Sequence, residues 1–396
     1  MNHDCRVCGR RVTREIFSHP DTPLFLGIIG ENTPEELINI NLPISLVVCE
    51  FCQTVQQPVE TKVDALLNQI YLTSQDNACS GTRTGEGEFG RQRANLFLKM
   101  TGLDTMPERI LEVGCNEGHM LAICKDRGGK QMVGVEPSAK MAFSPSPGIE
   151  ILPGYFDGST FSAEEFDLVY LIEVFEHIPH PMDFLRDVHR VLKPGGKLAM
   201  SMPNCETNLR YGNIGMPIHE HLLYFTPNSL ENALRRAEFE VMQVDSSFSH
   251  LYCLAQKSDV KQPLIEGKAP ETETFWPACE ERFAMVADFA SRQTGRWAFY
   301  GACSLTANLL SWGPEIDLIN ARVIDSDKNK WGHVISGCRL PTISPAQAKD
   351  EAIENVVVMP FGFQEGIESY IRQHLPSVNP ILLYGGLADQ YAQSKA

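Results

Sequence analysis

The sequence predicts an α/β protein with parallel strands, and three features lead to that fold class. An apolar segment, Ile110 to Val113, runs into a glycine turn that opens a helix over His119 to Arg127. A second apolar segment, Gln131 to Val135, follows and stops on Glu136. The order of strand, glycine turn, helix and strand returns between Trp297 and Asp325. Alternation of apolar strands with helices is typical of parallel sheets that helices cover on both faces.

Length and charge limit the function classes. A chain of 396 residues exceeds one compact core, so two or three domains are expected. The 34 basic residues are outnumbered by 50 acidic ones, and no basic run occurs. Because phosphate neutralisation dominates affinity for nucleic acid, no such partner is expected. No apolar run approaches the roughly 18 residues of a membrane span, and no secretion signal is recognisable. The composition therefore predicts a cytoplasmic protein without membrane contact.

Two C-x-x-C pairs lie near the start of the chain, Cys5 with Cys8 and Cys49 with Cys52. Two such pairs place four thiolates at the corners of a tetrahedron, the arrangement that zinc prefers. Four protein ligands leave no open position, so this zinc is expected to be structural. A redox dithiol and two unrelated pairs remain alternatives. The other eight of the twelve cysteines are scattered and suggest ordinary reduced thiols.

The first glycine turn, Gly114-Cys115-Asn116-Glu117-Gly118, has the features of a cofactor site. Its glycines let a ligand approach backbone N–H groups at the start of a helix. Glu136 follows Gly114 by roughly 20 residues, the interval at which a βαβ unit presents a carboxylate to ribose hydroxyls. The turn lacks the third glycine of a dinucleotide site, and the carboxylates of Glu112 and Glu117 suit a cationic sulfonium. An adenosine cofactor is expected, although an ordinary strand-to-helix connection uses the same turn.

The following segments continue the alternation. Before the glycine turn come a polar segment with three glycines that fits a lid or a plain linker, Tyr71 to Glu88, and a helix, Phe89 to Met100. After it come an apolar run that continues into E-V-F-E-H-I, Phe166 to Ile178, a helix, Phe184 to Leu192, the K-P-G-G turn, Lys193 to Gly196, and a strand, Lys197 to Met202. This order, with E-V-F-E-H-I at the end of the apolar run, resembles the class I S-adenosylmethionine (SAM) methyltransferases over about residues 88 to 255. The resemblance implies a Rossmann-like core with SAM at the carboxyl ends of the strands. The expected cofactor-binding residues are Glu112, Gly114, Asn116, Gly118, Glu136, Pro137, Glu173 and Phe175.

A second motif, His219-Glu220-His221, precedes Leu222-Leu223-Tyr224-Phe225. On an extended segment the two histidines would share one face, with Glu220 on the other. The four-cysteine module, this H-E-H-L-x-Y-F motif and the pattern D-x-x-x-x-K-x-G…G-x-x-x-P from Asp325 to Pro341 are together similar to the deoxysugar C-methyltransferases. That resemblance covers nearly the whole chain. It implies a zinc module over residues 1–70, a methyltransferase domain over 71–260 and a Rossmann-like substrate-binding domain over 275–396.

The resemblance also implies a mechanism and a substrate, a nucleotide-linked keto-sugar. A ketone acidifies the neighbouring C–H group, and a base can then form an enolate that accepts the methyl group. By resemblance, His221 is the expected base, and Glu220 and His219 are expected to orient it or the sugar. His177, directly after Glu176, is expected to be architectural.

Two departures from the family keep other functions open. Ile218 stands where the family usually has tyrosine, and Ser249 to Tyr252 replaces its usual glycine pair with serine. An O- or N-methyltransferase of a nucleotide sugar is therefore an alternative. An NAD-dependent oxidoreductase and a zinc-bearing interaction protein with an inactive core are more distant ones.

Overall fold

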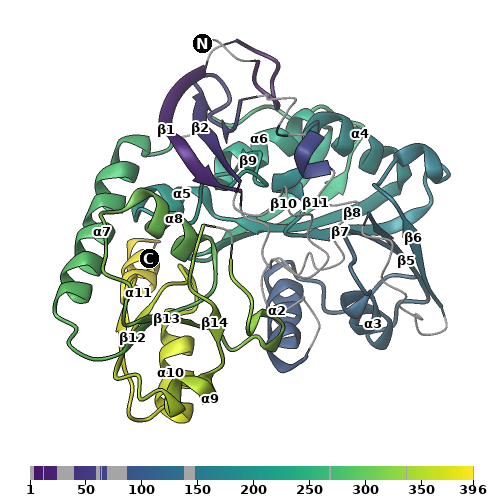
Figure 1. The fold of residues 1–396 in the computed structure, drawn as a ribbon. Helices are drawn as coiled ribbons and strands as arrows, with labels where there is room; N and C mark the ends of the chain where they lie inside the picture. The colour runs from purple at the N-terminus through teal and green to yellow at the C-terminus, as the bar shows by residue number, and fades with distance from the viewer. Residues whose placement is uncertain are drawn as a thin grey trace.

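The structure, a computed structural model, describes residues 4–11, 13–24, 40–58, 63, 65–68, 87–137, 148–266, 269–335 and 337–395. Its strands form three sheets, which occupy separate regions in Figure 1. The glycine-bearing segment that was predicted to be a lid or linker lies outside the described residues as far as residue 86. Among the residues that are described, no helix combines the length and the apolar character needed to cross a lipid bilayer.

The first sheet is antiparallel and has the order β1-β2-β3-β9. Its strands are β1 (Thr13–Pro23), β2 (Asn41–Cys49), β3 (Val55–Gln56) and β9 (Leu223–Tyr224). The first three strands follow one another along the chain, whereas β9 comes from the segment directly after His219-Glu220-His221. Val55 pairs with Tyr224, so this motif is tied to the cysteine module by main-chain hydrogen bonds.

The second sheet has seven strands in the order β10-β11-β8-β7-β4-β5-β6. Its strands are β4 (Arg109–Val113), β5 (Gln131–Glu136), β6 (Ile149–Pro153), β7 (Phe166–Ile172), β8 (Leu192–Pro203), β10 (Phe239–Ser246) and β11 (His250–Lys257). The five strands from β6 to β8 are parallel, and β11 is antiparallel to both of its neighbours. The order reverses between β4 and β7. In an open α/β sheet, a ligand binds outside the carboxyl ends of the strands at such a reversal.

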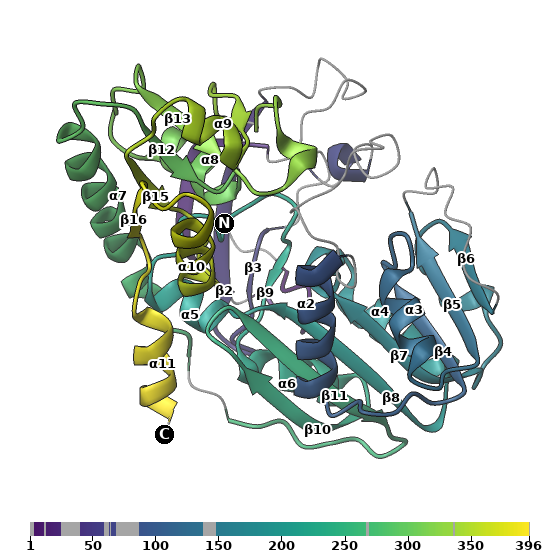
Figure 2. The same cartoon turned by 90° about the horizontal axis from the view of Figure 1, so that it is seen from below.

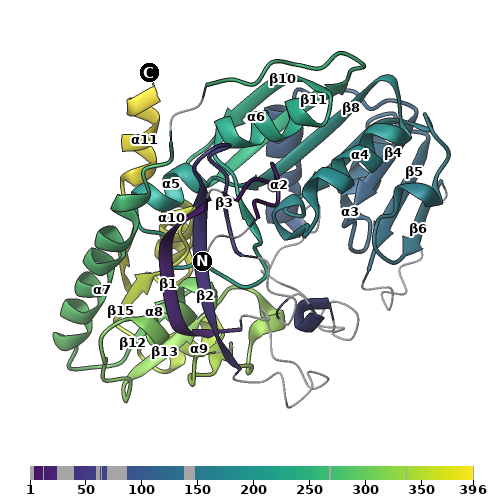
Figure 3. The ribbon, with the colours of Figure 1, turned by 90° about the horizontal axis from the view of Figure 1, so that it is seen from above.

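Helices cover both faces of this sheet. They are α2 (Gly87–Met100), α3 (His119–Asp126), α4 (Pro181–Val191) and α6 (Pro227–Arg236), with the short α5 (Cys205–Arg210) after β8. Figure 2 shows α2 and α3 on one face, and Figure 3 shows α4 and α6 on the other. Each face of the sheet has its own hydrophobic core. Neighbouring side chains of β4 point into different cores: Ile110 packs with α2 and α3, and Leu111 packs with α4 and α6. Burial on both faces explains the continuous apolar runs that identified these strands.

The third sheet is parallel and has the order β14-β13-β12-β15-β16. Its strands are β12 (Trp297–Tyr300), β13 (Ala321–Ile324), β14 (Thr342–Ile343), β15 (Asn355–Val358) and β16 (Asn379–Leu382). The accompanying helices are α7 (Phe275–Ser291), α8 (Ser304–Trp312), α9 (Pro345–Asp350), α10 (Gln364–His374) and α11 (Leu387–Lys395). The predicted α/β class with parallel sheets is confirmed, and a second Rossmann-like unit is present.

The first and third sheets share one hydrophobic core. Phe17 of β1 lies with its ring centroid 5.5 Å from that of Phe275 on α7 and 5.3 Å from that of Trp312 on α8. Figure 3 shows β1 and β2 alongside α8. A second junction joins the second and third sheets, where Phe248, between β10 and β11, stacks on Phe361 after β15 with centroids 4.6 Å apart. The third sheet therefore packs directly against both of the others.

Candidate active site

The turn after β4 is held against the end of β5. Gly114 N donates to the carbonyl of Val135 at 2.9 Å, and Asn116 N donates to Glu136 Oε2 at 2.9 Å. Gly114, Asn116 and Gly118 have φ values of 75°, 47° and 76°. Only glycine, or asparagine with its short polar side chain, adopts this region readily. The predicted turn and its carboxylate therefore meet at one point, with half-buried Pro137 directly after Glu136.

Glu112 lies beneath this turn on β4, with only 4% of its surface exposed. Its Oε2 accepts a hydrogen bond from the Tyr170 hydroxyl at 2.9 Å. Burial raises the pKa of Glu112 well above its ordinary value; the bond from Tyr170 opposes this effect and the charge of Glu136 adds to it. Glu112 was predicted to bind the cofactor as a carboxylate. In the structure it is a buried group bonded to Tyr170, and its cofactor role stays a prediction.

The loop after β7 runs beside the glycine turn. A Cβ atom at Gly114 would lie 2.5 Å from Cγ2 of Val174, so only glycine permits this approach. Glu173 has a φ of 55°, which is costly for a residue with a side chain and is typical of functional sites. Its Oε1 accepts from the Ser201 hydroxyl at 2.9 Å, and its Oε2 lies 3.5 Å from Nε2 of His250. The predicted residue Glu173 therefore directly precedes Val174, the residue that lies against the glycine turn.

The ring of Phe175 packs in the core, so the cofactor contact predicted for this residue, which stays a prediction, would have to come from its main chain. The ring is completely buried and stacks on Phe225 with centroids 5.2 Å apart and planes 11° apart. The residue begins a 3₁₀ helix, Phe175–His177, that turns the chain away from the sheet. The phenyl group anchors this turn in the core that α4 and α6 cover.

A pocket adjoins Glu173 at the carboxyl ends of β7 and β8. Its lining comes from α2, these two strands, the start of β11 and the residue before α10: Arg93, Leu96, Phe97, Ile172, Glu173, Ser201, His250, Tyr252 and Phe363. Phe363 belongs to the unit of the third sheet, and its exposed fraction is 45%. The pocket therefore combines charged, polar and aromatic groups from two of the three sheet units.

The His219-Glu220-His221 segment is a turn, and the expected extended conformation is wrong. His221 N donates to the carbonyl of Ile218 at 3.2 Å, which closes the turn. The two histidines consequently face different partners. His219 Nε2 lies 3.3 Å from the carbonyl of Pro43 in β2, whereas the His221 ring meets His177 edge to face with centroids 4.8 Å apart. Glu220 is buried within the turn.

Glu176, His177 and His221 form a buried cluster. Their carboxylate and imidazole ligand atoms lie within 4.8 Å of one another. Burial lowers the pKa of His177 to about 4, against a hydrogen bond with the backbone of Glu220 and the charge of Glu173. Burial also lowers the pKa of His221 well below its ordinary value, and His177 adds to this effect. Both imidazoles are therefore neutral at pH 7.

Glu176 completes the cluster with a carboxyl group. It is 2% exposed, and among the described residues neither of its carboxyl oxygens has a hydrogen-bond partner. Burial raises the pKa of Glu176 well above its ordinary value, with the charge of Glu173 adding to the shift. The cluster thus contains groups that can exchange a proton, and it lies on the loop that also carries Glu173.

Comparisons with known proteins agree with this geometry. Residues 86–244 match a family model described as a methyltransferase domain. The ubiquinone biosynthesis O-methyltransferase of Ruegeria pomeroyi is 30% identical over 179 residues, which are 40% of this chain and 68% of that enzyme. The chain belongs to the class I SAM-dependent methyltransferases. The seven-stranded sheet is the core of this methyltransferase, and its glycine turn lies where the sheet order reverses.

Two further comparisons cover larger or similar shares of the methyltransferase. The C-methyltransferase NovU of Streptomyces niveus is 26% identical over 257 residues, which are 62% of this chain. The match spans 58% of the length of NovU. A solved structure, the SAM-dependent methyltransferase from Mesorhizobium loti, aligns with a TM-score of 0.35 and 19% identity, covering 44% of this chain and 100% of that one.

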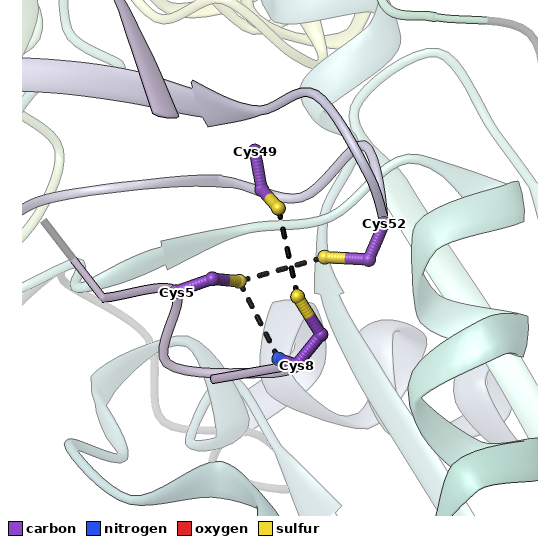
Figure 4. A group of neighbouring side chains, drawn as sticks. All are labelled: Cys5, Cys8, Cys49 and Cys52. Carbon is purple, nitrogen blue, oxygen red and sulfur yellow. Dashed lines mark hydrogen bonds between the residues drawn. The ribbon is translucent and has the colours of Figure 1, made fainter. Parts of the chain in front are cut away.

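The four predicted metal ligands of the methyltransferase do converge. Cys5 Sγ lies 3.5 Å from Cys52 Sγ, and Cys8 Sγ lies 3.6 Å from Cys49 Sγ (Figure 4). Tetrahedral zinc with bonds of about 2.3 Å separates its sulfur ligands by about 3.8 Å. The arrangement therefore fits a metal ion bound by four thiolates.

The second Rossmann-like unit of the methyltransferase has a similar turn after its strand β12, but there a lysine side chain binds the carboxylate. Ala302 N donates to Asp325 Oδ2 at 2.9 Å, as Asn116 N does to Glu136. In this unit Lys330 Nζ also binds Asp325 Oδ2 and the carbonyl of Ala302, each at 3.0 Å. A lysine of the chain thus neutralises the carboxylate at this corner.

Two residues of the site had no signal in the sequence. Gln57, 7% exposed, donates from its side-chain amide to three carbonyls of the histidine turn. Arg6, between the first two cysteines, donates to main-chain carbonyls on both sides of the same region. Neither belongs to a catalytic motif, and their partners lie far away along the chain.

Proposed function

We propose that this methyltransferase forms a carbon–carbon bond on a nucleotide-linked keto-sugar. The observation that carries the proposal is the contact between the neutral His177 and His221 rings, on the loop whose Val174 lies beside Gly114 of the glycine turn. Methylation of carbon requires a base beside the methyl donor, and the cluster supplies one. The C-methyltransferase NovU is among the relatives. The sugar part of the proposal rests on the family motifs and on the second Rossmann-like unit.

In the proposed reaction, SAM binds at Gly114, Asn116, Gly118, Glu136 and Pro137, with Glu173 beside it. His221 takes a proton from the carbon next to the ketone, and the electron pair of that C–H bond forms an enolate. The enolate carbon then attacks the methyl carbon, the C–S bond breaks, and the sulfonium becomes a neutral thioether. Alignment of the two reacting carbons accounts for a large part of the rate increase.

The remaining predicted residues then have supporting roles. Glu220 hydrogen-bonds to His177 through its backbone, so it links the two imidazoles. His219 is 1% exposed and faces β2, so we propose that it orients the turn and does not contact the sugar. The protonated form of His221 would lie beside Glu176, whose carboxyl group could then release its proton and offset the charge.

We also propose that Cys5, Cys8, Cys49 and Cys52 hold a structural zinc ion. All four ligand positions are then filled by protein, so the ion would stabilise the module and leave no coordination site for a substrate. The convergence of the four sulfur atoms supports this assignment.

A second candidate is O-methylation of a related sugar. It is favoured by the O-methyltransferase among the relatives and by Ile218, which is 8% exposed and supplies no hydroxyl group. A hydroxyl substrate requires a base but no ketone.

The test combines a substrate panel with two opposite variants. The full chain is incubated with SAM and nucleotide-linked keto-, hydroxy- and amino-sugars, and mass spectrometry with NMR locates the new methyl group. His221→Asn is expected to lower turnover by about 100-fold or more with unchanged SAM affinity. Glu136→Gln is expected to weaken SAM binding by about tenfold or more. His180→Gln, on the exposed surface, is the control.

Three outcomes would overturn parts of the proposal. A methyl group on oxygen would establish the second candidate. Unchanged turnover in His221→Asn would move the base elsewhere. Loss of activity on mild chelation, with the cysteine-bound zinc retained and activity restored by Mn²⁺, would make Glu176, His177 and His221 metal ligands and not a proton-transfer cluster.

A further inference from the structure

We propose that Gln57 and Arg6 of the cysteine module are positioning residues for the two histidines of the active site. The inference rests on the proposed function, because it assigns proton removal to His221. It adds that the module sets the placement of that base through hydrogen bonds from two of its own side chains.

Gln57 holds the histidine turn by its carbonyl groups. Its side-chain Nε2 lies 2.8 Å from the carbonyl oxygen of Ile218, 3.3 Å from that of His219 and 2.6 Å from that of His221. A turn leaves its carbonyls without partners from a regular helix or sheet, and buried carbonyls require partners. Gln57 supplies them with one buried amide.

Main-chain hydrogen bonds connect Gln57 to the same region. Gln57 N donates to the carbonyl of Leu222 at 2.9 Å, and Leu222 N donates to the carbonyl of Glu176 at 2.8 Å. One residue of the cysteine module is therefore linked to both segments that carry the cluster. Tyr224 adds a further constraint, because its hydroxyl lies 3.3 Å from the carbonyl oxygen of Ile218.

Arg6 reaches the other histidine segment. Its guanidinium donates to the carbonyls of Gln57 at 3.2 Å, Pro58 at 3.3 Å and Pro179 at 3.1 Å. Pro179 lies two residues after His177 in the loop that follows β7. Arg6 N also donates to Gln56 Oε1 at 2.9 Å. The Arg6 side chain thus connects three segments: the first C-x-x-C loop, the segment after the second C-x-x-C pair and the His177 loop.

The two contacts act on different histidines. Gln57 fixes the backbone of His221 and Arg6 fixes the loop of His177, and the edge-to-face contact of the two rings depends on both placements. A base that is displaced by about 1 Å from its acidic C–H group loses much of its rate advantage. SAM contacts neither residue in this proposal, so cofactor affinity should not depend on them.

The experiment separates positioning from packing. Gln57→Met keeps the volume of the side chain but removes its donors, and Arg6→Lys keeps the charge but cannot span three carbonyls. Each variant is compared with a matched control in the same module. Gln53→Met loses a bond from Gln53 to the carbonyl of Glu50, and Arg11→Lys loses an exposed pair with Asp4. The measurements are kcat, KM, SAM affinity, zinc content and the imidazole NMR signals of the full chain.

The expected result for Gln57→Met is a fall in kcat of about 10- to 100-fold, with SAM affinity and zinc content within twofold of wild type. The His221 signals should shift or broaden, and Arg6→Lys should do the same to His177 with a smaller loss in kcat. Both controls should match wild type. An unchanged kcat in a folded, zinc-loaded Gln57→Met protein, or equal losses of kcat and SAM affinity, would overturn the inference.

A failure of the inference remains distinguishable from a failure of the proposed function. If the wild-type enzyme methylates no keto-sugar, the proposed function is wrong. The histidine signals are read without substrate, and unchanged His221 and His177 signals in both variants would then overturn the positioning roles. If Gln57→Met does not fold, Arg6→Lys decides the question by the same measurements.

Discussion

Burial determines the protonation state of each member of the Glu176, His177 and His221 cluster. A charged group loses hydration when it is buried, so carboxyl groups retain their protons and imidazoles release theirs. The structure shows both shifts, upward for Glu176 and downward for the two histidines. At pH 7 both imidazoles are therefore neutral, and His221 has a free lone pair for a proton.

His177 is expected to make the folded protein less stable in mild acid. Its pKa is about 4 in the folded protein against an ordinary value of 6.5. Between pH 6.5 and pH 4 the unfolded chain binds a proton that the folded chain does not, so the free energy of unfolding falls as the pH falls. His177→Gln removes this contribution. Urea unfolding at stepped pH values should show a shallower slope in the variant than in wild type.

The groups that face His177 are Glu173, Glu176 and His221, and all three stay in place in this variant. His180→Gln serves as the control, because His180 is exposed and precedes α4. The interpretation fails if His177→Gln and wild type lose stability with the same slope between pH 6.5 and pH 4.

At the scale of elements, the two cysteine pairs are expected to act as one metal-dependent unit. Cys8→Ser removes one of four converging sulfur atoms, so zinc should fall from one ion per chain to a small fraction. Because metal binding in such a site contributes directly to folding, several kcal/mol of stability should be lost. Atomic absorption and thermal unfolding measure the two effects. Cys303→Ser, outside the module, should retain the zinc, and a Cys8→Ser protein with full zinc content would refute the four-cysteine site.

Elements with local signals could be predicted from the sequence, and elements defined by distant partners could not. β5 has the predicted start at Gln131 and stops at the predicted Glu136, because its apolar run is buried on both faces of the sheet. β1 was missed because most of its residues are exposed or half-buried and its partner is β2. β9 has two residues and exists through its pairing with β3. α4 starts at Pro181, three residues before the prediction, because proline is well suited to the first turn of a helix.

The same distinction applies to the site. Gly114, Asn116 and Glu136 come from one βαβ unit, so their spacing was sufficient to bring them together. The conformation of His219-Glu220-His221 depends on Gln57, which lies in another sheet, and an isolated H-E-H pattern does not encode it. The division into residues 1–70, 71–260 and 275–396 stays a prediction, as do the roles of the individual site residues.

At the scale of the whole molecule, the shared core of the first and third sheets should make unfolding cooperative. Phe17 is 6% exposed and packs against α7 and α8. Phe17→Ala should cost about 3–5 kcal/mol, because a large buried ring is replaced by a cavity. Calorimetry should show one transition that moves to lower temperature as a unit.

Ile319→Ala is the control for this variant, because Ile319 is 78% exposed and its truncation creates no cavity. Two transitions, of which only one moves in Phe17→Ala, would show that the first and third sheets unfold independently.

The pairing of β3 with β9 constrains the order in which the newly synthesised chain can fold. Arg6 and Pro179 are 173 positions apart, and Val55 finds Tyr224 only after most of the central sheet has left the ribosome. Contacts this distant in sequence form slowly, because a long loop must close first. The cysteine loops can therefore bind their ion early, while the fourth strand of their sheet and the histidine turn wait for later translation. Catalytic competence would then be among the last properties that the nascent polypeptide acquires.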